Sequence, residues 1–251
     1  ASSFIGMILI GTFLLMLPIS SQSGQWTPLI DALFTATSAS CVTGLAVLDT
    51  GKYFSLFGKT VIIVLIQIGG LGIMTITTLF SVGIGRRMKM KQRFLMQDAL
   101  NQDNSAELEK ITAKIIKYTI FIEFVFGSIL AWYFYDDHGM EAIYWGYWHA
   151  VSAFCNAGFD LLGNFTSFVN YRGDIVINLV LMTLIILGGI GFSVIGEVIN
   201  IRKWRDYSLH TKIVLSVNTT LIVLGTLFVF FSEMDNPLTL GGLSLGEKLL
   251  A

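Results

Sequence analysis

The stretch Ser-Ala-Ser-Cys-Val-Thr-Gly-Leu at residues 38–45 decides the fold, because a similar stretch recurs later in the chain. The second copy reads Ser-Ala-Phe-Cys-Asn-Ala-Gly-Phe at residues 152–159, and serine, alanine, cysteine and glycine coincide at an offset of 114. Further along, Ile-Gly-Gly-Leu-Gly at 68–72 matches Leu-Gly-Gly-Ile-Gly at 187–191 at an offset of 119. The chain therefore contains an internal repeat, and the similarity is concentrated in two short segments of each copy.

The composition is typical of a membrane protein. The chain is 54% hydrophobic and 13% charged, whereas a soluble domain carries about 25% charged residues. A net charge of −1 provides no basic field for nucleic acid, and two cysteines cannot form a disulfide framework. We therefore expect a polytopic, all-α membrane protein with lipid contacts and no nucleic-acid partner.

Five apolar segments are candidates for membrane helices. They are Phe4–Leu17, Phe57–Ile84, Ile111–Phe134, Ile175–Val198 and Ile213–Phe231. The last four are long enough to cross a hydrocarbon core of about 30 Å with some tilt. The first is too short, and we interpret it as the truncated remainder of a transmembrane helix.

Two further apolar segments, Thr27–Ser40 and Ala142–Phe154, are too short to cross a membrane and too hydrophobic for ordinary loops. Each is predicted to be a re-entrant helix that enters the membrane and turns back. Thr27 is expected to cap the first of them, with Pro28 in its first turn.

Basic residues predict the orientation in the membrane. Most of them lie between the second and third spans, at the edge of the third, or between the fourth and fifth: Arg86, Arg87, Lys89, Lys91, Arg93, Lys110, Lys114, Lys117, Arg202, Lys203, Arg205 and Lys212. The positive-inside rule makes that side cytoplasmic, including residues 86–110 and 201–212. Acidic residues prevail on the opposite, outer side, where they would attract cations.

A basic cluster follows each copy of the repeat, at Arg86 and at Arg202, so the two copies have the same polarity across the membrane. Repeats of like polarity are related about the membrane normal, whereas inverted repeats are common in secondary transporters. A ring of such units around that normal encloses a channel. Duplication for packing alone is the simpler alternative.

The predicted fold is a set of repeated helix–re-entrant pore loop–helix units arranged around a central pore. Residues 1–85 would form the first repeat, 86–110 a cytoplasmic linker, 111–200 the second repeat, and 201–251 the truncated start of a third. Short helices that descend from outside would point their partially negative C-terminal ends at mid-membrane, which favours a cation. Glycines at 44 and 158 would let the backbone turn its carbonyl oxygens inward.

With these loops, glycines and basic clusters in this order, the chain resembles the Ktr/Trk superfamily of potassium-uptake membrane subunits over essentially its whole length. The resemblance implies potassium uptake across the cytoplasmic membrane through a carbonyl-lined selectivity filter. It assigns the filter ligands to Val42, Thr43, Gly44, Asn156, Ala157 and Gly158. It also places Cys41, Leu45, Cys155 and Phe159 beside the pore.

The same resemblance implies K⁺ as the transported ion, with no organic cofactor on this chain and no enzymatic activity. Its partners would be a second copy, in a homodimer, and a cytosolic ring of nucleotide- or NAD-binding regulator subunits. The family carries four filter loops and a gating loop, and this sequence supplies only the first two filter loops. Glycine at 44, rather than serine, is similar to the potassium-selective members.

Two other classes of function fit the sequence less well. An intramembrane enzyme would need a nucleophile–base pair or a metal motif, and the sequence contains no HExxH metal motif. A secondary transporter for organic solutes is disfavoured by the common polarity of the repeats.

Several residues admit a packing role or a functional one. Cys41 and Cys155 are either small buried thiols or thiols near the conduction path. Glu123 lies mid-span, where a carboxylate forms interhelical hydrogen bonds or serves transport. His149 is interpreted as a packing residue rather than as a proton relay or metal ligand.

Two further regions also admit either a packing role or a functional one. The paired glycines Gly69, Gly70, Gly188 and Gly189 permit either close helix packing or flexing beneath the filter. The segment Arg86–Lys110 mixes basic residues with methionine and phenylalanine, which suits either anionic lipid or docking of the regulator.

Overall fold

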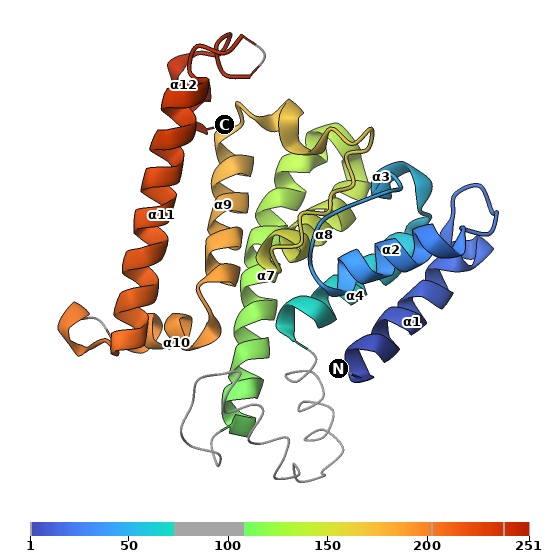
Figure 1. Ribbon diagram of the computed structural model, residues 1–251, viewed down its shortest axis with the longest axis horizontal. Helices are drawn as coiled ribbons and strands as arrows, with labels where there is room; N and C mark the ends of the chain where they lie inside the picture. Colours follow the sequence, from blue (N-terminus) through green and yellow to red (C-terminus); the bar gives the residue numbers. More distant parts are fainter. Residues whose placement is uncertain (1, 73–107, 202, 238, 251) are drawn as a thin grey trace. The chain divides into compact units, whose positions relative to one another are not determined.

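The computed structural model describes residues 2–72, 108–201, 203–237 and 239–250. Contacts divide the chain into two compact units, Ala1–Ser167 and Phe168–Ala251 (Figure 1). Within the described ranges the regular elements are helices, and the only extended pairing is an isolated antiparallel bridge between Ser21 and Phe54. The predicted all-helical class is confirmed, while the arrangement of re-entrant units around a pore stays a prediction.

The first unit begins with two helices that pack side by side, α1 (Ser2–Met16) and α2 (Leu29–Ser40). They are joined through a short 3-10 helix, η1 (Pro18–Ser20). The backbone N–H of Thr27 donates to the carbonyl of Met16 at 3.2 Å, which fixes the start of α2 against the end of α1.

The start of α2 differs from the prediction. Pro28 occupies the N-cap position, and no side chain among the described residues caps this helix. The predicted Thr27 cap is therefore wrong. The reason is a tertiary contact, because the Thr27 hydroxyl accepts a hydrogen bond of 3.3 Å from the hydroxyl of Tyr53.

After α2 the chain returns toward the end of the helix from which it came. It passes through residues 41–49, which we call the first loop, into α3 (Thr50–Tyr53). Tyr53 then contacts Thr27, and its carbonyl accepts from the backbone N–H of Gln22 at 2.9 Å. This return path is what a re-entrant segment requires, and its placement in a membrane stays a prediction.

Helix α4 (Leu56–Leu71) leads away from this turn. The Ser55 hydroxyl caps its start by accepting from the N–H of Gly58 at 3.2 Å. Its end is set by Gly72, which has φ 79° and so takes a backbone conformation that favours glycine. The rest of the predicted Phe57–Ile84 span lies outside the described residues.

Two helices, α7 (Leu108–His138) and α8 (Ala142–Phe154), pack against each other after a turn of 3-10 helix, η2 (Gly139–Glu141). The bounds of α8 are those expected for the second short apolar segment. Gly146 makes the close approach feasible, because a Cβ there would lie 2.4 Å from the backbone nitrogen of Ala131 on α7.

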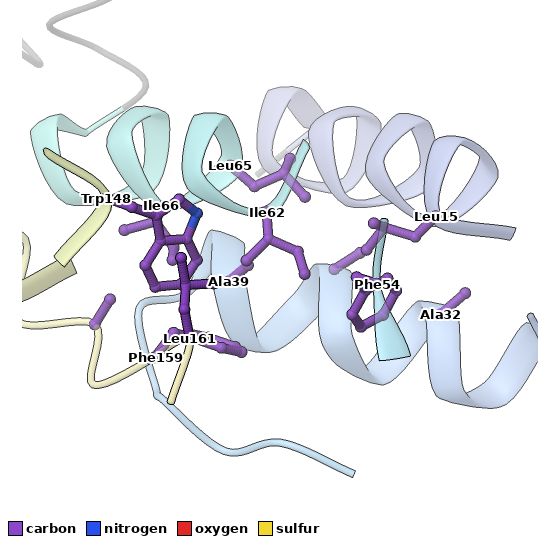
Figure 2. Close-up of a cluster of buried hydrophobic side chains, with 12 residues drawn as sticks. Leu15, Ala32, Ala39, Phe54, Ile62, Leu65, Ile66, Trp148, Phe159 and Leu161 are labelled. Atoms are coloured by element: carbon purple, nitrogen blue, oxygen red, sulfur yellow. The ribbon is translucent and has the colours of Figure 1, made fainter. Parts of the chain in front are cut away.

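Apolar side chains from α1, α2, α4 and α8 form the core of this unit (Figure 2). Leu15 comes from α1, Ile62 and Ile66 from α4, and Trp148 from α8, and each is at most 2% exposed. Close van der Waals packing of this kind holds helices together in a membrane. The Trp148 indole N–H also donates to the carbonyl of Lys59 at 3.1 Å, so α8 is held to α4 by a polar contact as well.

The second unit is also helical. Its elements are η3 (Ser167–Tyr171), α9 (Ile175–Gly189), α10 (Phe192–Asn200), η4 (Trp204–Asp206), α11 (Leu209–Glu233) and α12 (Leu245–Leu250). Asp174 caps α9, since its carboxylate accepts from the N–H groups of Val176 and Ile177 at 3.0 and 3.1 Å. Glu197 on α10 accepts from the N–H and hydroxyl of Ser208, which joins α10 to the start of α11.

The predicted span Ile175–Val198 is not one straight helix. The chain bends by 103° between α9 and α10. Gly191 at the break has φ 88° and ψ 144°, an extended backbone of positive φ that interrupts the helix. Hydropathy alone did not reveal this bend, because the residues on both sides of it are apolar.

Two helical stretches of the described chain are long and apolar enough to cross a membrane. They are Lys114–Phe154, which runs through α7 into α8, and Leu209–Glu233. The bent pair α9 and α10 would make a third if it counts as one span, and Ser3–Met16 and Leu56–Leu71 are shorter apolar helices.

The close contact between α7 and α8 predicts an effect on stability. Replacing Gly146 with valine should lower the free energy of unfolding by about 1–3 kcal/mol, because the added atoms meet backbone that cannot yield easily. Thermal unfolding of the detergent-solubilised protein would measure the change. Gly225→Val is the matched control, since nothing lies within 4 Å of a Cβ at that helical glycine. Equal shifts for both variants would contradict the prediction.

Candidate functional site

The two repeated stretches adopt the same backbone conformation. Val42 and Asn156 have φ of 56° and 57°, although neither is a glycine. Two residues later, Gly44 and Gly158 have φ of 75° and 74°. The first loop and residues 155–166, which we call the second loop, therefore start with equivalent geometry directly after α2 and α8.

Each loop is closed by a serine on the preceding helix. The Ser38 hydroxyl donates to the carbonyl of Leu45 at 2.7 Å, and the Ser152 hydroxyl donates to the carbonyl of Phe159 at 2.6 Å. The carbonyl of each serine also accepts a backbone N–H from the loop, at 3.0 and 2.8 Å respectively. These serines were absent from the predicted site, although their identity in both copies of the repeat was a signal for them.

The two loops meet at their glycines. A Cβ at Gly44 would lie 2.4 Å from the carbonyl oxygen of Ala157 and 3.3 Å from the Cα of Gly158. A Cβ at Gly158 would lie 3.6 Å from the Cα of Gly44. The structure thus brings the predicted residues of both loops together, backbone against backbone.

Paired glycines on α4 let both loops approach that helix. A Cβ at Gly69 would lie 2.2 Å from the carbonyl oxygen of Ser40, the last residue of α2 before the first loop. A Cβ at Gly70 would lie 2.5 Å from Sγ of Cys155, at the start of the second. The close-packing interpretation is confirmed for this pair, and for Gly188 and Gly189 it stays a prediction.

The side chains around the paired backbones are not equivalent. Leu45 is 63% exposed, whereas Phe159 is 4% exposed. Ala157 is buried and Thr43 is exposed. Of the two free thiols, Cys155 is half-buried and Cys41 is exposed, so the interpretation of both as buried thiols is wrong for Cys41.

His149 has a packing role, as predicted. Its Nδ1 lies 2.9 Å from the carbonyl of Trp145, and its Nε2 accepts from the backbone N–H of Leu161 at 3.1 Å. The imidazole is 1% exposed and fixes the second loop to α8, one turn before the serine that closes the loop.

Glu123 has the interhelical hydrogen bond that its position predicted. Its Oε1 accepts from Nε2 of Gln67 at 3.0 Å, which connects α7 with α4. The Glu123 side chain is 8% exposed.

The outer parts of the two loops contact each other as well. The backbone N–H of Asn164 in the second loop donates to the carboxylate of Asp49 in the first, and Nζ of Lys52 on the adjoining α3 donates to Oδ1 of Asn164 at 2.5 Å. Near this contact, burial raises the pKa of the Asp160 carboxyl, and the Asp49 carboxylate raises it as well, against hydrogen bonds from backbone N–H groups. The loops are therefore joined both at their glycines and at this outer contact.

Comparison with known proteins identifies the class. The family model described as TrkH, cation transport protein, matches residues 1–238. The chain belongs to this family and is a multi-pass membrane protein. Members of the family are cation transporters, so the intramembrane-enzyme alternative is set aside.

Among curated relatives, the chain is 43% identical to Ktr system potassium uptake protein B of Bacillus subtilis (strain 168), with 100% of this chain and 56% of the relative covered. It is 39% identical to the protein of the same name from Vibrio alginolyticus, covering 99% of this chain and 54% of the relative. It is 38% identical to the potassium/sodium uptake protein NtpJ of Enterococcus hirae, covering 99% and 55%. The chain spans about half the length of these curated relatives.

The contact between His149 and Leu161 predicts how substitutions will act. His149→Leu should lower the free energy of unfolding by about 1–3 kcal/mol, because it leaves the buried N–H of Leu161 without its acceptor. His149→Gln should have a free energy of unfolding closer to that of the parent, because an amide oxygen can replace Nε2 as the acceptor. Thermal unfolding of both variants tests this, and a leucine variant as stable as the parent would refute it.

Proposed function

We propose that the chain is part of a pore-forming subunit that takes up potassium across the cytoplasmic membrane. Two of the relatives described above are named as potassium uptake proteins, and the third as a potassium/sodium uptake protein. The observation that carries the proposal is the pairing of two loops of like conformation at Gly44 and Gly158.

Backbone carbonyl oxygens are the proposed ligands of the ion. They belong to Val42, Thr43, Gly44, Asn156, Ala157 and Gly158. Carbonyl oxygens can replace the hydration shell of K⁺ in a narrow filter. Each set follows directly on the C-terminal end of a short helix, α2 or α8, where the helix dipole is partially negative and favours a cation.

Two loops cannot surround an ion. Because the chain matches about half the length of its relatives, we propose that further loops of the same kind come from the rest of the subunit. Cys41, Leu45, Cys155 and Phe159 would then lie beside the conduction path. The exposure of Leu45 and Cys41 supports this arrangement, since the first loop has an uncovered side.

Sodium is the second candidate ion, because the Enterococcus hirae relative is named a potassium/sodium uptake protein. Glycine at position 44 favours potassium, through the resemblance to potassium-selective members. Asp49 and Asp160, near the outer contact of the loops, would attract either cation toward the filter.

The proposed filter predicts a strong effect of Gly44→Ala. An L-residue at φ 75° costs about 1–2 kcal/mol, and the new Cβ would displace the carbonyl of Ala157. Potassium uptake by the full-length protein, in a bacterial host without its own uptake systems, should fall at least about tenfold. Flame photometry of potassium-depleted cells would measure it.

Gly24→Ala is the matched control. Gly24 has φ 68°, so alanine there meets a similar backbone cost, but nothing lies within 4 Å of its Cβ. Uptake by this control should stay near that of the parent. Full uptake by Gly44→Ala would show that the filter is assigned to the wrong residues.

Partners follow from the same proposal. The subunit would form a homodimer and bind a cytosolic ring of nucleotide- or NAD-binding regulators, with residues 86–110 and 201–212 on the cytoplasmic side. The name "Ktr system", carried by two relatives, supports an assembly of more than one component. No organic cofactor is proposed for this chain.

Docking of a regulator on residues 86–110 is testable, although this segment lies almost wholly outside the described residues. Changing Lys89, Lys91 and Arg93 to glutamine should reduce copurification of the regulator at least about threefold, because each contact to an acidic surface contributes up to about 1 kcal/mol. Unchanged copurification, together with weaker binding to anionic vesicles, would favour the lipid-contact alternative.

A further inference from the structure

A polar bridge runs from α7 through α4 to the second loop. Nε2 of Gln67 on α4 donates to Oε1 of Glu123 on α7 at 3.0 Å. The other end of the same amide, Oε1 of Gln67, accepts a contact of 3.9 Å from Sγ of Cys155. Gln67 is thus placed between a carboxylate and the first residue of the second loop.

Hydrogen bonding determines which end of the Gln67 amide faces Glu123 and which end faces Cys155. In the hydrogen bond between Gln67 and Glu123, Oε1 of Glu123 is the acceptor, and a side-chain amide has one donating end and one accepting end. When Glu123 takes the NH₂ end of Gln67, the carbonyl end is left facing Cys155. The orientation of the amide, and with it the acceptor offered to the second loop, therefore depends on Glu123.

Packing holds Cys155 in reach of this acceptor. Gly70 lies on α4 three residues after Gln67, and the absence of a side chain there leaves room for Sγ of Cys155. Cys155 directly precedes Asn156, whose φ of 57° starts the unusual backbone of the loop. A shift of Cys155 would therefore be passed to the backbone of Asn156 and Ala157.

The bridge joins the two repeats, because Gln67 lies in the first while Glu123 and Cys155 lie in the second, and it is not repeated symmetrically. At the offset of 119 that aligns the second halves of the repeats, the counterpart of Gln67 is Ile186, which has no polar group in its side chain. The counterpart of Cys155 is Cys41, which is exposed rather than half-buried. The two loops thus share a backbone conformation and differ in how they are held.

We propose that Gln67, oriented by Glu123, is a positioning residue that holds the second loop in its ion-binding conformation. The proposal rests on the proposed function as a potassium pore. Neither side chain touches the ion; both act through Cys155. The bridge should therefore influence ion affinity and the discrimination between K⁺ and Na⁺ rather than the amount of folded protein.

Uptake by the full-length protein gives the first test. Gln67→Met keeps the length of the side chain and removes both polar contacts. It should raise the KM for K⁺ about fivefold, the factor in an equilibrium constant for one lost buried hydrogen bond, with Vmax within about twofold. Inhibition by Na⁺ should increase in parallel. Ile186→Met, at the position of the second repeat that is equivalent to Gln67, is the control and should change the KM less.

An exchange of the two polar groups gives the second test. Gln67→Glu alone places two carboxylates side by side and should impair uptake more than Gln67→Met. Adding Glu123→Gln restores one amide and one carboxylate, with an acceptor still facing Cys155, and should return the KM to within about twofold of the parent. A double variant no better than the single one would overturn the proposal.

A chemical measurement separates this proposal from the proposed function. In purified protein carrying Cys41→Ser, the rate at which N-ethylmaleimide modifies Cys155 should rise about fivefold in Gln67→Met, because the thiol is released more often from its position. An unchanged rate, or a lower melting temperature and Vmax with an unchanged KM, would overturn the positioning role. A parent protein that takes up no K⁺ would defeat the proposed function, while the modification rate would still decide whether Gln67 positions the loop.

Discussion

The first unit depends on one steric constraint, the contact between two backbones at Gly44 and Gly158. The carbonyl oxygen of Ala157 occupies space that a Cβ at Gly44 would need, at 2.4 Å. Real Cβ atoms essentially never come so close to another atom, so the two loops can meet only because position 44 lacks a side chain. Every other feature of the proposed site, from the carbonyl ligands to the outer contact, requires these loops to be adjacent.

Around that contact, short-range polar interactions hold each loop and helix packing holds the pair. Ser38 and Ser152 close the loops onto their own helices, and His149 fixes the second loop to α8. Gly69 and Gly70 then allow both loops to lie against α4. The side chains that hold the two loops in shape therefore lie mostly on the neighbouring helices.

The sequence predicted what depends on local pattern. Matching copies of the repeat located the left-handed glycines, and hydropathy with length gave the bounds of α8. The prediction from sequence failed where a contact distant in the chain determines the local structure. At Thr27 the expected helix cap is absent, because its hydroxyl accepts a hydrogen bond from the hydroxyl of Tyr53. The prediction also failed at the bend near Gly191, because hydropathy records the environment of a residue and not the direction of the chain. The unequal burial of Cys41 and Cys155 could not be predicted from the repeat, because aligned residues of the two copies have different neighbours in the fold.

The equal backbones and unequal side chains of the two loops have an evolutionary consequence. A ligand that belongs to the main chain is present whatever residue the gene encodes, so substitution cannot delete it. In the proposed site, selection would act on shape, through the serine and glycine shared by both copies, rather than on ligand identity. Val42 and Asn156, or Leu45 and Phe159, accordingly differ between the two copies, while the backbone conformation is the same. Sites of this kind tolerate sequence drift that would destroy a site built from carboxylates or imidazoles.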